Sequence, residues 1–406
     1  LNLVAVVDKS GSMSGAKINS LKQTLTFVLK ELGKHDRFGI VEYDTHVNTS
    51  LALTSMDEKG KQEAQRVIDA IRTGSSTNLS GGFLEGLRMF PQNVETKVVS
   101  SLLLMTDGLA NVGITSTQGI ISMFQKTQSE GIGKCAVNTF GFGTDHDAKM
   151  LKDISAAGEG MYYFIENDDS IPTAFADCLG GLLSVVGQGI ELKIEASPNH
   201  LIQNVWTAKP LTVLEPHRSY RIAMGDLQEG EERDVPFEIS LPTVSAGTSP
   251  IVQVTLTYYD VKGETMKEVK CDVQLERPDQ VTEEHKIPNL LVDRNCNRCK
   301  VGKAMEEASE IAAKGNLKPA RDLLERIIVE VSASPSSQEE FCQGLITELR
   351  TALSGLQDRN VYVQQGQYQM NWASNALNMQ RSAAPESSMQ SAAFSSYETN
   401  ARRCMK

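Results

Sequence analysis

Residues 7–15 read Val-Asp-Lys-Ser-Gly-Ser-Met-Ser-Gly, a polar turn punctuated by glycine between two apolar segments. The preceding residues 3–7 form a short apolar run that is typical of a buried β-strand. In the following residues 18–32 the apolar side chains recur with a helical period. A strand, a polar turn and a helix in this order indicate the start of an α/β sheet, in which ligands bind where the strands end.

The same alternation of strand and helix continues through residue 187. We expect strands at residues 3–7, 37–43, 47–53, 98–106, 134–140 and 160–165. We expect helices at residues 18–32, 57–71, 79–90, 115–130, 148–156 and 170–186. The Leu-Leu-Leu run at 102–104 is typical of a strand buried on both faces, and residues 37–53 read as an antiparallel edge hairpin. Residues 1–187 are therefore predicted to be an α/β domain with a doubly wound, mostly parallel sheet.

Beyond residue 187 the pattern changes twice. Residues 188–278 alternate apolar and polar with a period of two, which predicts an antiparallel β-sandwich. Residues 279–357 return to a helical period. Residues 358–406 are rich in Gln, Asn, Ser, Ala and Met with little periodicity, so we expect a flexible low-complexity tail. Trp372 in that tail could pack internally or anchor a partner.

Composition narrows the classes of partner. The chain has 406 residues, 40% of them hydrophobic and 22% charged, which is typical of globular domains. The formal net charge of −11 argues against a nucleic-acid backbone as the main partner. No apolar run approaches the roughly 18–20 residues needed to span a bilayer, so we predict no membrane span. Because the chain begins at Leu1 rather than Met, we expect it to be part of a longer product.

Oxygen-bearing side chains gather at the predicted ligand edge of the sheet. Asp8, Ser10 and Ser12 occupy alternate positions of the opening turn, and alternate side chains of an extended turn point the same way. Thr77 opens the helix after residues 57–71, and Asp107 follows the strand at 98–106. Two carboxylates and three hydroxyls form the kind of all-oxygen set that Mg²⁺ prefers, and Mn²⁺ is a possible substitute.

These residues carry a resemblance to a known family. The Asp-x-Ser-x-Ser motif at residues 8–12, followed by Thr77 and Asp107, resembles the metal-ion-dependent adhesion site of the von Willebrand factor type A (VWA) domain. The resemblance implies that Ser10, Ser12 and Thr77 bind the metal directly or nearly so. It also implies that Asp8 and Asp107 often act through water, and that an acidic group of a partner protein completes the metal shell. It implies a binding module rather than an enzyme.

The later part of the chain resembles one group within that family. Residues 221–241 resemble the β-sandwich that follows such domains in this group. Residues 292–324 resemble its helical "intervening" (Vwaint-like) segment, which lies before a self-processing Hint (hedgehog/intein-like) domain. A Hint domain, if the whole protein carries one, should lie beyond Lys406.

Other readings of the same residues remain open. Asp8 could be the nucleophile of a haloacid-dehalogenase-type phosphohydrolase, although Ser10 stands where that class places its general acid. The same metal site could instead serve self-association, with an acidic residue of a second copy as the ligand. The Asp145-His146-Asp147 segment could form a second cation site near the same edge.

Two glycosylation sequons bear on location. They begin at Asn48 and Asn78, and Asn78 is adjacent to the predicted ligand Thr77. A glycan there would crowd the open face of the metal. The seven cysteines, an odd number spread thinly along the chain, do not suggest a disulfide framework. We therefore expect a cytoplasmic protein.

Overall fold

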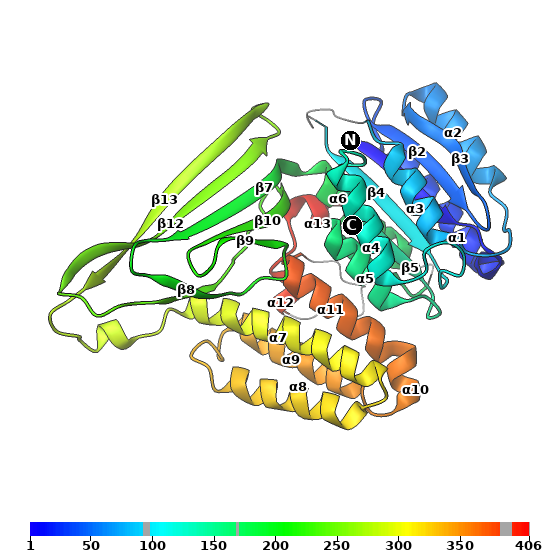
Figure 1. Ribbon diagram of the computed structural model, residues 1–406. Helices are drawn as coiled ribbons and strands as arrows, with labels where there is room; N and C mark the ends of the chain where they lie inside the picture. The colour runs from blue at the N-terminus through cyan, green and yellow to red at the C-terminus, as the bar shows by residue number, and fades with distance from the viewer. Residues whose placement is uncertain (92–97, 168–169, 382–391, 406) are drawn as a thin grey trace.

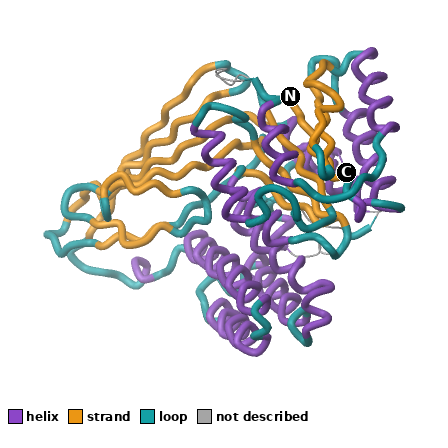
Figure 2. The backbone as a smooth tube through the Cα atoms, turned by 45° about the vertical axis from the view of Figure 1, so that its right-hand side comes forward, coloured by secondary structure: helices purple, strands orange, loops and turns teal. Residues whose placement is uncertain are grey.

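The computed structural model describes residues 1–91, 98–167, 170–381 and 392–405. It has three parts: an α/β domain, an antiparallel β region and a helical region that lies beneath both (Figures 1 and 2). The hydrophobic core of the α/β domain continues into the helical region, while the antiparallel sheets enclose a smaller core of their own.

The first part is built on a six-stranded sheet with the order β3-β2-β1-β4-β5-β6. Its strands are β1 (Asn2–Asp8), β2 (Arg37–Tyr43), β3 (Val47–Ser55), β4 (Ser100–Thr106), β5 (Ala136–Phe142) and β6 (Glu159–Ile165). All neighbouring pairs are parallel except β2 and β3, which form the predicted antiparallel hairpin. The prediction of a doubly wound, mostly parallel sheet is thus confirmed.

Helices connect these strands. They are the short η1 (Gly11–Met13), α1 (Ala16–Glu31), α2 (Glu58–Ala70), α3 (Leu79–Arg88), α4 (Thr117–Ser129), α5 (Ala148–Ala157) and α6 (Ser170–Leu183). Side-chain caps mark several starts, as expected from the Asp and Asn at those positions. Asp57 accepts a hydrogen bond from the Gly60 amide at the start of α2, and Asn78 accepts one from the Gly81 amide at the start of α3.

The strand order places the candidate residues at one edge. The chain runs outward from β1 to β2 and returns to β4 on the other side of β1, so β1 and β4 flank the topological switch point. Val7 is paired with Met105 in register, and Asp8 is the last residue of β1. The carboxyl ends of β1 and β4 therefore lie side by side, which brings Asp8 close to Asp107.

The second part contains two antiparallel sheets. Its strands are β7 (Val185–Ala196), β8 (Leu201–Val205), β9 (Leu211–Glu215), β10 (Ser219–Gln228), β11 (Phe237–Ser240), β12 (Gly247–Asp260) and β13 (Thr265–Arg277). Five of them form a sheet with the order β13-β12-β7-β10-β9, while β11 pairs with β8. Ile194 and Ile222 of the large sheet pack in one core with Ile202 of the small sheet. This is a sandwich in which the small sheet covers only part of the large one.

The third part is helical. It comprises η2 (Glu284–Lys286), α7 (Leu290–Ala313), α8 (Leu317–Ser332), α9 (Glu340–Ser354), α10 (Arg359–Val361), the π-helical turn η3 (Tyr362–Gly366), α11 (Gln367–Met379), α12 (Ala392–Ser395) and α13 (Asn400–Met405). Among the described residues, none of the helices combines the length and the apolar character needed to cross a bilayer.

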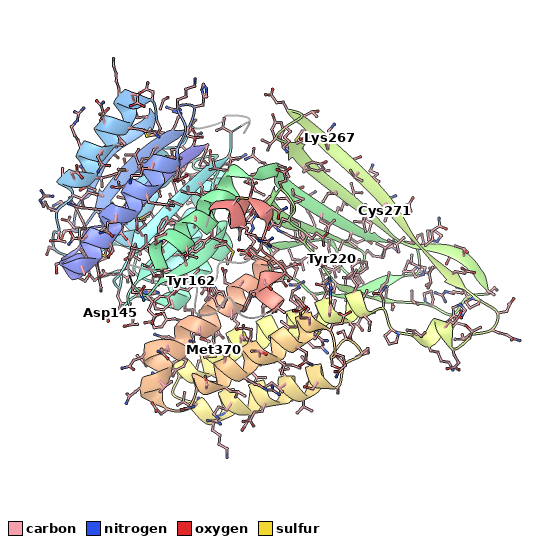
Figure 3. All side chains as sticks on the ribbon, turned by 180° about the vertical axis from the view of Figure 1, so that it is seen from behind. Asp145, Tyr162, Tyr220, Lys267, Cys271 and Met370 are labelled. Atoms are coloured by element: carbon pink, nitrogen blue, oxygen red, sulfur yellow. The ribbon has the colours of Figure 1, made fainter. Side chains whose placement is uncertain are left out.

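The prediction of a flexible tail over residues 358–406 is wrong for the described part of that segment. Helix α11 is largely buried between α7 and the α5–β6 side of the first domain, where the Tyr162 amide donates to Asn375 Oδ1 at 3.2 Å. Figure 3 labels Met370 of α11 and Tyr162 of β6, which mark the two elements that meet here. Trp372 is 4% exposed and packs on Phe394, with ring centroids 4.5 Å apart, so it anchors α12 internally. Residues 382–391 and 406 lie outside the described part.

Candidate functional site

Hydrogen bonds between loops hold the candidate residues together. The Gly11 amide of the turn after β1 donates to the Ser75 carbonyl at 2.8 Å, which ties that turn to the segment before α3. The Thr77 amide donates to Asn111 Oδ1 at 2.8 Å, which ties the same segment to the loop after β4. Three loops from the carboxyl edge of the sheet are thus fastened beside one another.

A chain of short contacts joins four of the five predicted residues. The Ser10 amide donates to Asp8 Oδ1 at 2.8 Å, which folds the turn back onto the end of β1. Ser10 Oγ and Ser12 Oγ lie 3.0 Å apart. Ser12 Oγ donates to Asp107 Oδ1 at 2.8 Å and so bridges the loops after β1 and β4.

The fifth residue, Thr77, is brought to the same point beside Gly108. A Cβ atom added at Gly108 would lie 3.3 Å from Ser12 Oγ, 3.6 Å from Thr77 Oγ1 and 4.0 Å from Asp8 Oδ2. Oxygen atoms from two loops therefore surround one small space beside the third loop, and glycine at position 108 leaves that space free. All five predicted site residues meet here.

Burial gives this cluster an unusual electrostatic setting. Asp8 and Asp107 have no exposed surface, and Ser10 and Thr77 are almost fully buried. Burial raises the pKa of Asp8 more than the hydrogen bonds from Thr106 and Ser10 lower it, and the negative charge of Asp107 adds to the rise. Two buried carboxylates in one place favour a bound cation.

Lys17, which the sequence analysis did not single out, supplies one positive charge. Its Nζ atom lies 2.5 Å from Asp107 Oδ2 and 3.3 Å from Asp145 Oδ2. Burial lowers the pKa of Lys17, but the hydrogen bonds and charges of the two carboxylates outweigh burial and leave this pKa raised. A signal was present in the sequence. Lys17 lies in the first turn of α1, where the helix dipole disfavours a cation unless a carboxylate is near.

Thr106 is a second residue of this cluster that was not predicted from the sequence. Its Oγ1 donates to Asp8 Oδ2 at 2.6 Å and accepts from the Gly108 amide at 3.2 Å. Since the Ser10 amide occupies Asp8 Oδ1, both oxygens of Asp8 carry a hydrogen bond. Thr106 directly precedes Asp107 and ends the predicted strand at 98–106, so its side chain was interpreted only as part of a buried strand.

The proposed second cation site at residues 145–147 looks different in the structure. Asp145, labelled in Figure 3, is 77% exposed and faces the Lys17 ammonium. His146 turns inward, with Nδ1 2.7 Å from the Gly143 carbonyl and Nε2 2.7 Å from the Tyr162 hydroxyl. Asp147 accepts from the Met150 amide as the cap of α5. These three side chains diverge rather than form one site.

Carboxylates, histidines and cysteines alone do not form a metal site in the described residues, where no three such side chains gather suitably. Any metal at the carboxyl edge of β1 and β4 would depend on hydroxyl oxygens as well as the two carboxylates. The hydroxyls of Ser10, Ser12 and Thr77 supply that chemistry, and hard divalent cations accept such oxygen ligands. The residues present thus fit a small divalent cation.

Two family models match the chain. The model described as "von Willebrand factor type A domain" matches residues 2–177. The model described as "CPSF6-like, RSLD domain, N-terminal region" matches residues 290–393. The likeness of the helical region to the intervening segment remains a prediction.

Two curated relatives match the chain over part of their own length. The chain is 29% identical over 264 residues to E3 ubiquitin-protein ligase WAV3 of Arabidopsis thaliana, covering 64% of the chain and 33% of that protein. It is 27% identical over 244 residues to the uncharacterized protein YfbK of Escherichia coli, covering 59% of the chain and 42% of that protein. The chain thus spans less than half of the length of either relative.

A solved structure with a similar fold covers most of the chain. It is a von Willebrand factor type A protein from Catenulispora acidiphila, with a TM-score of 0.69 at 16% identity over 84% of this chain and 81% of that one. At this identity the likeness concerns the fold. Taken with the match over residues 2–177 and the strand order of the first sheet, it leads to one assignment. The N-terminal part of this chain is a von Willebrand factor type A domain, to which a further antiparallel sheet region and a helical region are joined.

Proposed function

We propose that Asp8, Ser10, Ser12, Thr77 and Asp107 bind Mg²⁺, with Mn²⁺ as a possible substitute, and that the bound metal recognises an acidic side chain of a partner protein. The cation would supply a Lewis-acidic centre with a position open to a carboxylate. The chain's own residues would hold the cation and orient it toward solvent. VWA domains are typically protein-binding modules, which agrees with this proposal.

One observation carries the proposal above all others. Asp8 Oδ2 and Ser12 Oγ come from the end of β1 and the turn after it and Thr77 Oγ1 from the segment before α3, and all three lie within 4.0 Å of one point beside Gly108 in the loop after β4. Such convergence of hydroxyl and carboxylate oxygens at the ligand edge of the sheet is not needed for packing. Three of the five side chains are neutral hydroxyls, so the two carboxylates balance the charge of a divalent cation without exceeding it, and an acidic ligand can still approach the metal.

The proposed activity is binding rather than catalysis. Both oxygens of Asp8 carry a hydrogen bond and the side chain has no exposed surface, which disfavours its use as a phosphohydrolase nucleophile. The ligase activity in the name of the Arabidopsis relative belongs to a protein of which this chain covers 33%. It therefore forms no part of the proposal.

The first experiment uses Mn²⁺ alone, counted by electron paramagnetic resonance, with Mg²⁺ as the competitor. We expect one site in the wild type, and an affinity about tenfold or more weaker after Thr77→Ala or Ser12→Ala, because each removes an oxygen ligand. Asp145→Asn is the matched control. It removes a nearby carboxylate outside the cluster and should change the affinity by no more than about twofold. Unchanged Mn²⁺ binding in both cluster variants would contradict the metal site.

A second experiment addresses the partner. A random peptide library is selected on the wild-type chain in Mg²⁺ and, in parallel, in EDTA. We expect enrichment of Asp- or Glu-containing peptides only in Mg²⁺, with binding lost when the acid is changed to its amide. Enrichment that does not depend on the metal would contradict recognition through this site. Mg²⁺-dependent self-association without peptide binding would instead favour the self-assembly alternative.

We also propose that the chain functions in the cytoplasm. Asn78 caps α3 through its side chain and lies beside Thr77, so a glycan at Asn78 would disturb both the helix start and the metal cluster. Expression through a secretory pathway tests this. A protein glycosylated at Asn78 that still binds Mn²⁺ normally would contradict this reason for a cytoplasmic location.

A further inference from the structure

Strand β13 (Thr265–Arg277) leaves a long sheet edge open. It is the outermost strand of the five-stranded sheet and pairs with β12 along one side over its full length. Nearly all of its 13 residues are exposed, and it lies at the outer margin of the molecule (Figure 1). In the described part of the chain no other strand pairs with its second side. An unpaired edge of this length is a template for another strand.

One face of this edge is apolar. Val269 is opposite Leu256 of β12, and Val273 is opposite Val252, so these side chains share the face that forms the sandwich core. Val252 is 1% exposed, whereas Val273 is 36% and Val269 is 53% exposed. The core face therefore continues onto β13 beyond the cover of the small sheet.

We propose that β13 pairs antiparallel with β13 of a second copy of this chain, with the twofold axis passing through Cys271. This pairing would join two five-stranded sheets into one continuous sheet. It does not involve the candidate metal site, and it goes beyond the binding function proposed above. The exposed Cys271, labelled with Lys267 in Figure 3, is the midpoint of β13.

The apolar face selects half of the possible registers. Residues that face each other across an antiparallel pair lie on the same side of the sheet. With the axis through a residue, Val269 faces the second copy's Val273 or another residue of the same face, so the two apolar faces merge. With the axis between residues, Val269 faces a charged or polar side chain such as Asp272, and the apolar faces point in opposite directions.

Charge then distinguishes the registers whose axis lies at Lys270, Cys271 or Asp272. With the axis at Cys271, Lys270 faces the second copy's Asp272 twice, Glu268 faces Gln274, and all 13 residues of each strand are paired. With the axis at Lys270, two lysines face each other and Glu268 faces Asp272. With the axis at Asp272, two aspartates face each other. Opposite charges stabilise cross-strand pairs and like charges destabilise them.

Charged residues on edge strands usually prevent such pairing. Here Lys270 opposes pairing only when the register is shifted. With the axis at Cys271, the antiparallel arrangement places each Lys270 opposite the Asp272 of the other copy. Lys270 and Asp272 are both exposed in the single chain, where Lys270 meets Glu268 at 2.9 Å and Asp272 accepts from Gln253 at 2.8 Å. Neither contact needs to break for a second strand to approach from the open side.

The test measures association of the full 406-residue chain by sedimentation velocity over a range of concentrations, in reductant. We expect a monomer–dimer equilibrium that EDTA does not change. Lys270→Asp alone and Asp272→Lys alone should each weaken the dimer at least about tenfold, because both symmetry-related pairs become repulsive. An equimolar mixture of the two variants should restore association as a heterodimer. Lys59→Asp, an exposed change on α2, is the control and should leave the dimer constant within about twofold.

Cross-linking tests the register independently. Oxidised glutathione should join two Cys271 thiols into one disulfide, while its own S–S bond breaks and it takes up the two electrons and two protons to give two molecules of reduced glutathione. Facing Cα atoms in an antiparallel pair lie about 4.5–5.5 Å apart, within the range of a disulfide. Cys271→Ser should abolish the covalent dimer but keep the reversible one. In that background a Val269→Cys protein should not link to itself, because the two thiols would lie roughly 13 Å apart along the strands. Mixed with a Val273→Cys protein, it should form heterodimers.

Several results would overturn the proposal. One is a monomer at every concentration tested. Another is a dimer whose dissociation constant is unchanged by Lys270→Asp and by Asp272→Lys, since its interface would then lie elsewhere. A dimer that EDTA dissociates would point to association through the metal site. Self-linking of the Val269→Cys protein without linking to the Val273→Cys protein would show a different register.

Discussion

The Lys17 ammonium lies 2.5 Å from Asp107 Oδ2, so one of the two buried carboxylates of the candidate site already has a cation beside it. Two carboxylates as close as Asp8 and Asp107 would repel each other without metal. The structure adds a third charge to that pair, because Lys17 reaches back from the first turn of α1. A divalent cation that uses Asp107 would have to compete with Lys17 or share its carboxylate.

The first prediction concerns Lys17→Met. Removing the ammonium should tighten Mn²⁺ binding by about tenfold, since a unit charge close to the site no longer repels the metal. The same change should lower the melting temperature in EDTA, because Asp107 stays buried without its partner. Mn²⁺ titration and thermal melts measure the two effects, which have opposite signs. Lys30→Met, an exposed change on the same helix, should produce neither.

The second prediction concerns Asp107→Asn. We expect the variant to lose most of the stability that excess Mg²⁺ gives the wild type by mass action. In EDTA it should be less stable than the wild type by about 1–3 kcal/mol, because the buried Asp107–Lys17 hydrogen bond loses its charge. That sign reverses the simple expectation from carboxylate repulsion. Thermal melts with and without Mg²⁺ provide the measurement.

A double-mutant cycle separates the two explanations. If Lys17 and Asp107 are coupled in the metal-free state, Asp107→Asn should cost less unfolding free energy in EDTA when Lys17 has already been changed to Met. An Asp107→Asn protein that is more stable than the wild type in EDTA would show that repulsion between Asp8 and Asp107 outweighs the Asp107–Lys17 contact.

The site could be predicted from the sequence because its residues lie in loops whose place the strand order fixes. Asp8, Ser10 and Ser12 follow one central strand and Asp107 follows its neighbour, so the carboxyl edge brings them together. Lys17 could not be found in this way. Its role depends on the direction of a flexible side chain from the first turn of a helix, and hydrophobic periodicity says nothing about that direction.

The helical tail was missed for a different physical reason. A helix that is buried on one side shows an apolar stripe, and that stripe is what a periodicity argument detects. Helix α11 is buried on more than one side, and its buried positions include Asn371, Ser374 and Asn375. Asn375 shows how such a polar group is satisfied by a distant part of the chain, since its Oδ1 accepts from the Tyr162 amide. A composition rich in Asn, Gln and Ser therefore looked like disorder.

The third prediction tests how α11 is held. Arg381, just beyond α11, donates through Nε to Glu231 Oε1 at 2.7 Å, and both side chains are at least nine-tenths buried. Burial alone would raise the pKa of Glu231, but the charges of Arg381 and Arg233 lower it to about 2. Arg381→Met should cost about 3 kcal/mol of unfolding free energy, because a buried carboxylate loses one of its two cations. Urea unfolding measures this cost.

The matched control is Arg326→Met. Arg326 lies 4.0 Å from Glu330 on the exposed side of α8, and such a surface pair contributes about 0.5 kcal/mol or less. Equal losses for the two arginine variants would mean that the Arg381–Glu231 pair is not an anchor of the C-terminal segment.

The fourth prediction concerns pH and His146, which packs between the first domain and α11. Its ring lies among Tyr162, Phe164 and Tyr368, with centroid distances of 5.9, 5.6 and 5.0 Å. Burial, with a smaller contribution from the positive charge of Lys17, lowers its pKa from 6.5 to about 4 against the opposing effects of the Gly143 carbonyl and the Asp145 charge. Between these two pH values the imidazole is protonated in the unfolded chain and neutral in the folded one. The unfolded state then binds more protons, so the stability contributed by His146 is complete above pH 6.5 and is lost as the pH falls toward 4.

The loss over that window should reach roughly 3 kcal/mol, since each pKa unit corresponds to about 1.4 kcal/mol. Urea unfolding in EDTA at a series of pH values measures it. His146→Gln should flatten the dependence between pH 6.5 and 4.5, whatever its effect on stability at pH 7, because glutamine does not titrate. Glu231, whose pKa is lowered to about 2, acts below that window, since its contribution is lost only as the pH falls below 4.5. His35→Gln, at an exposed position, should keep the wild-type slope. A His146→Gln protein with that same slope would show that the acid sensitivity arises elsewhere in the fold.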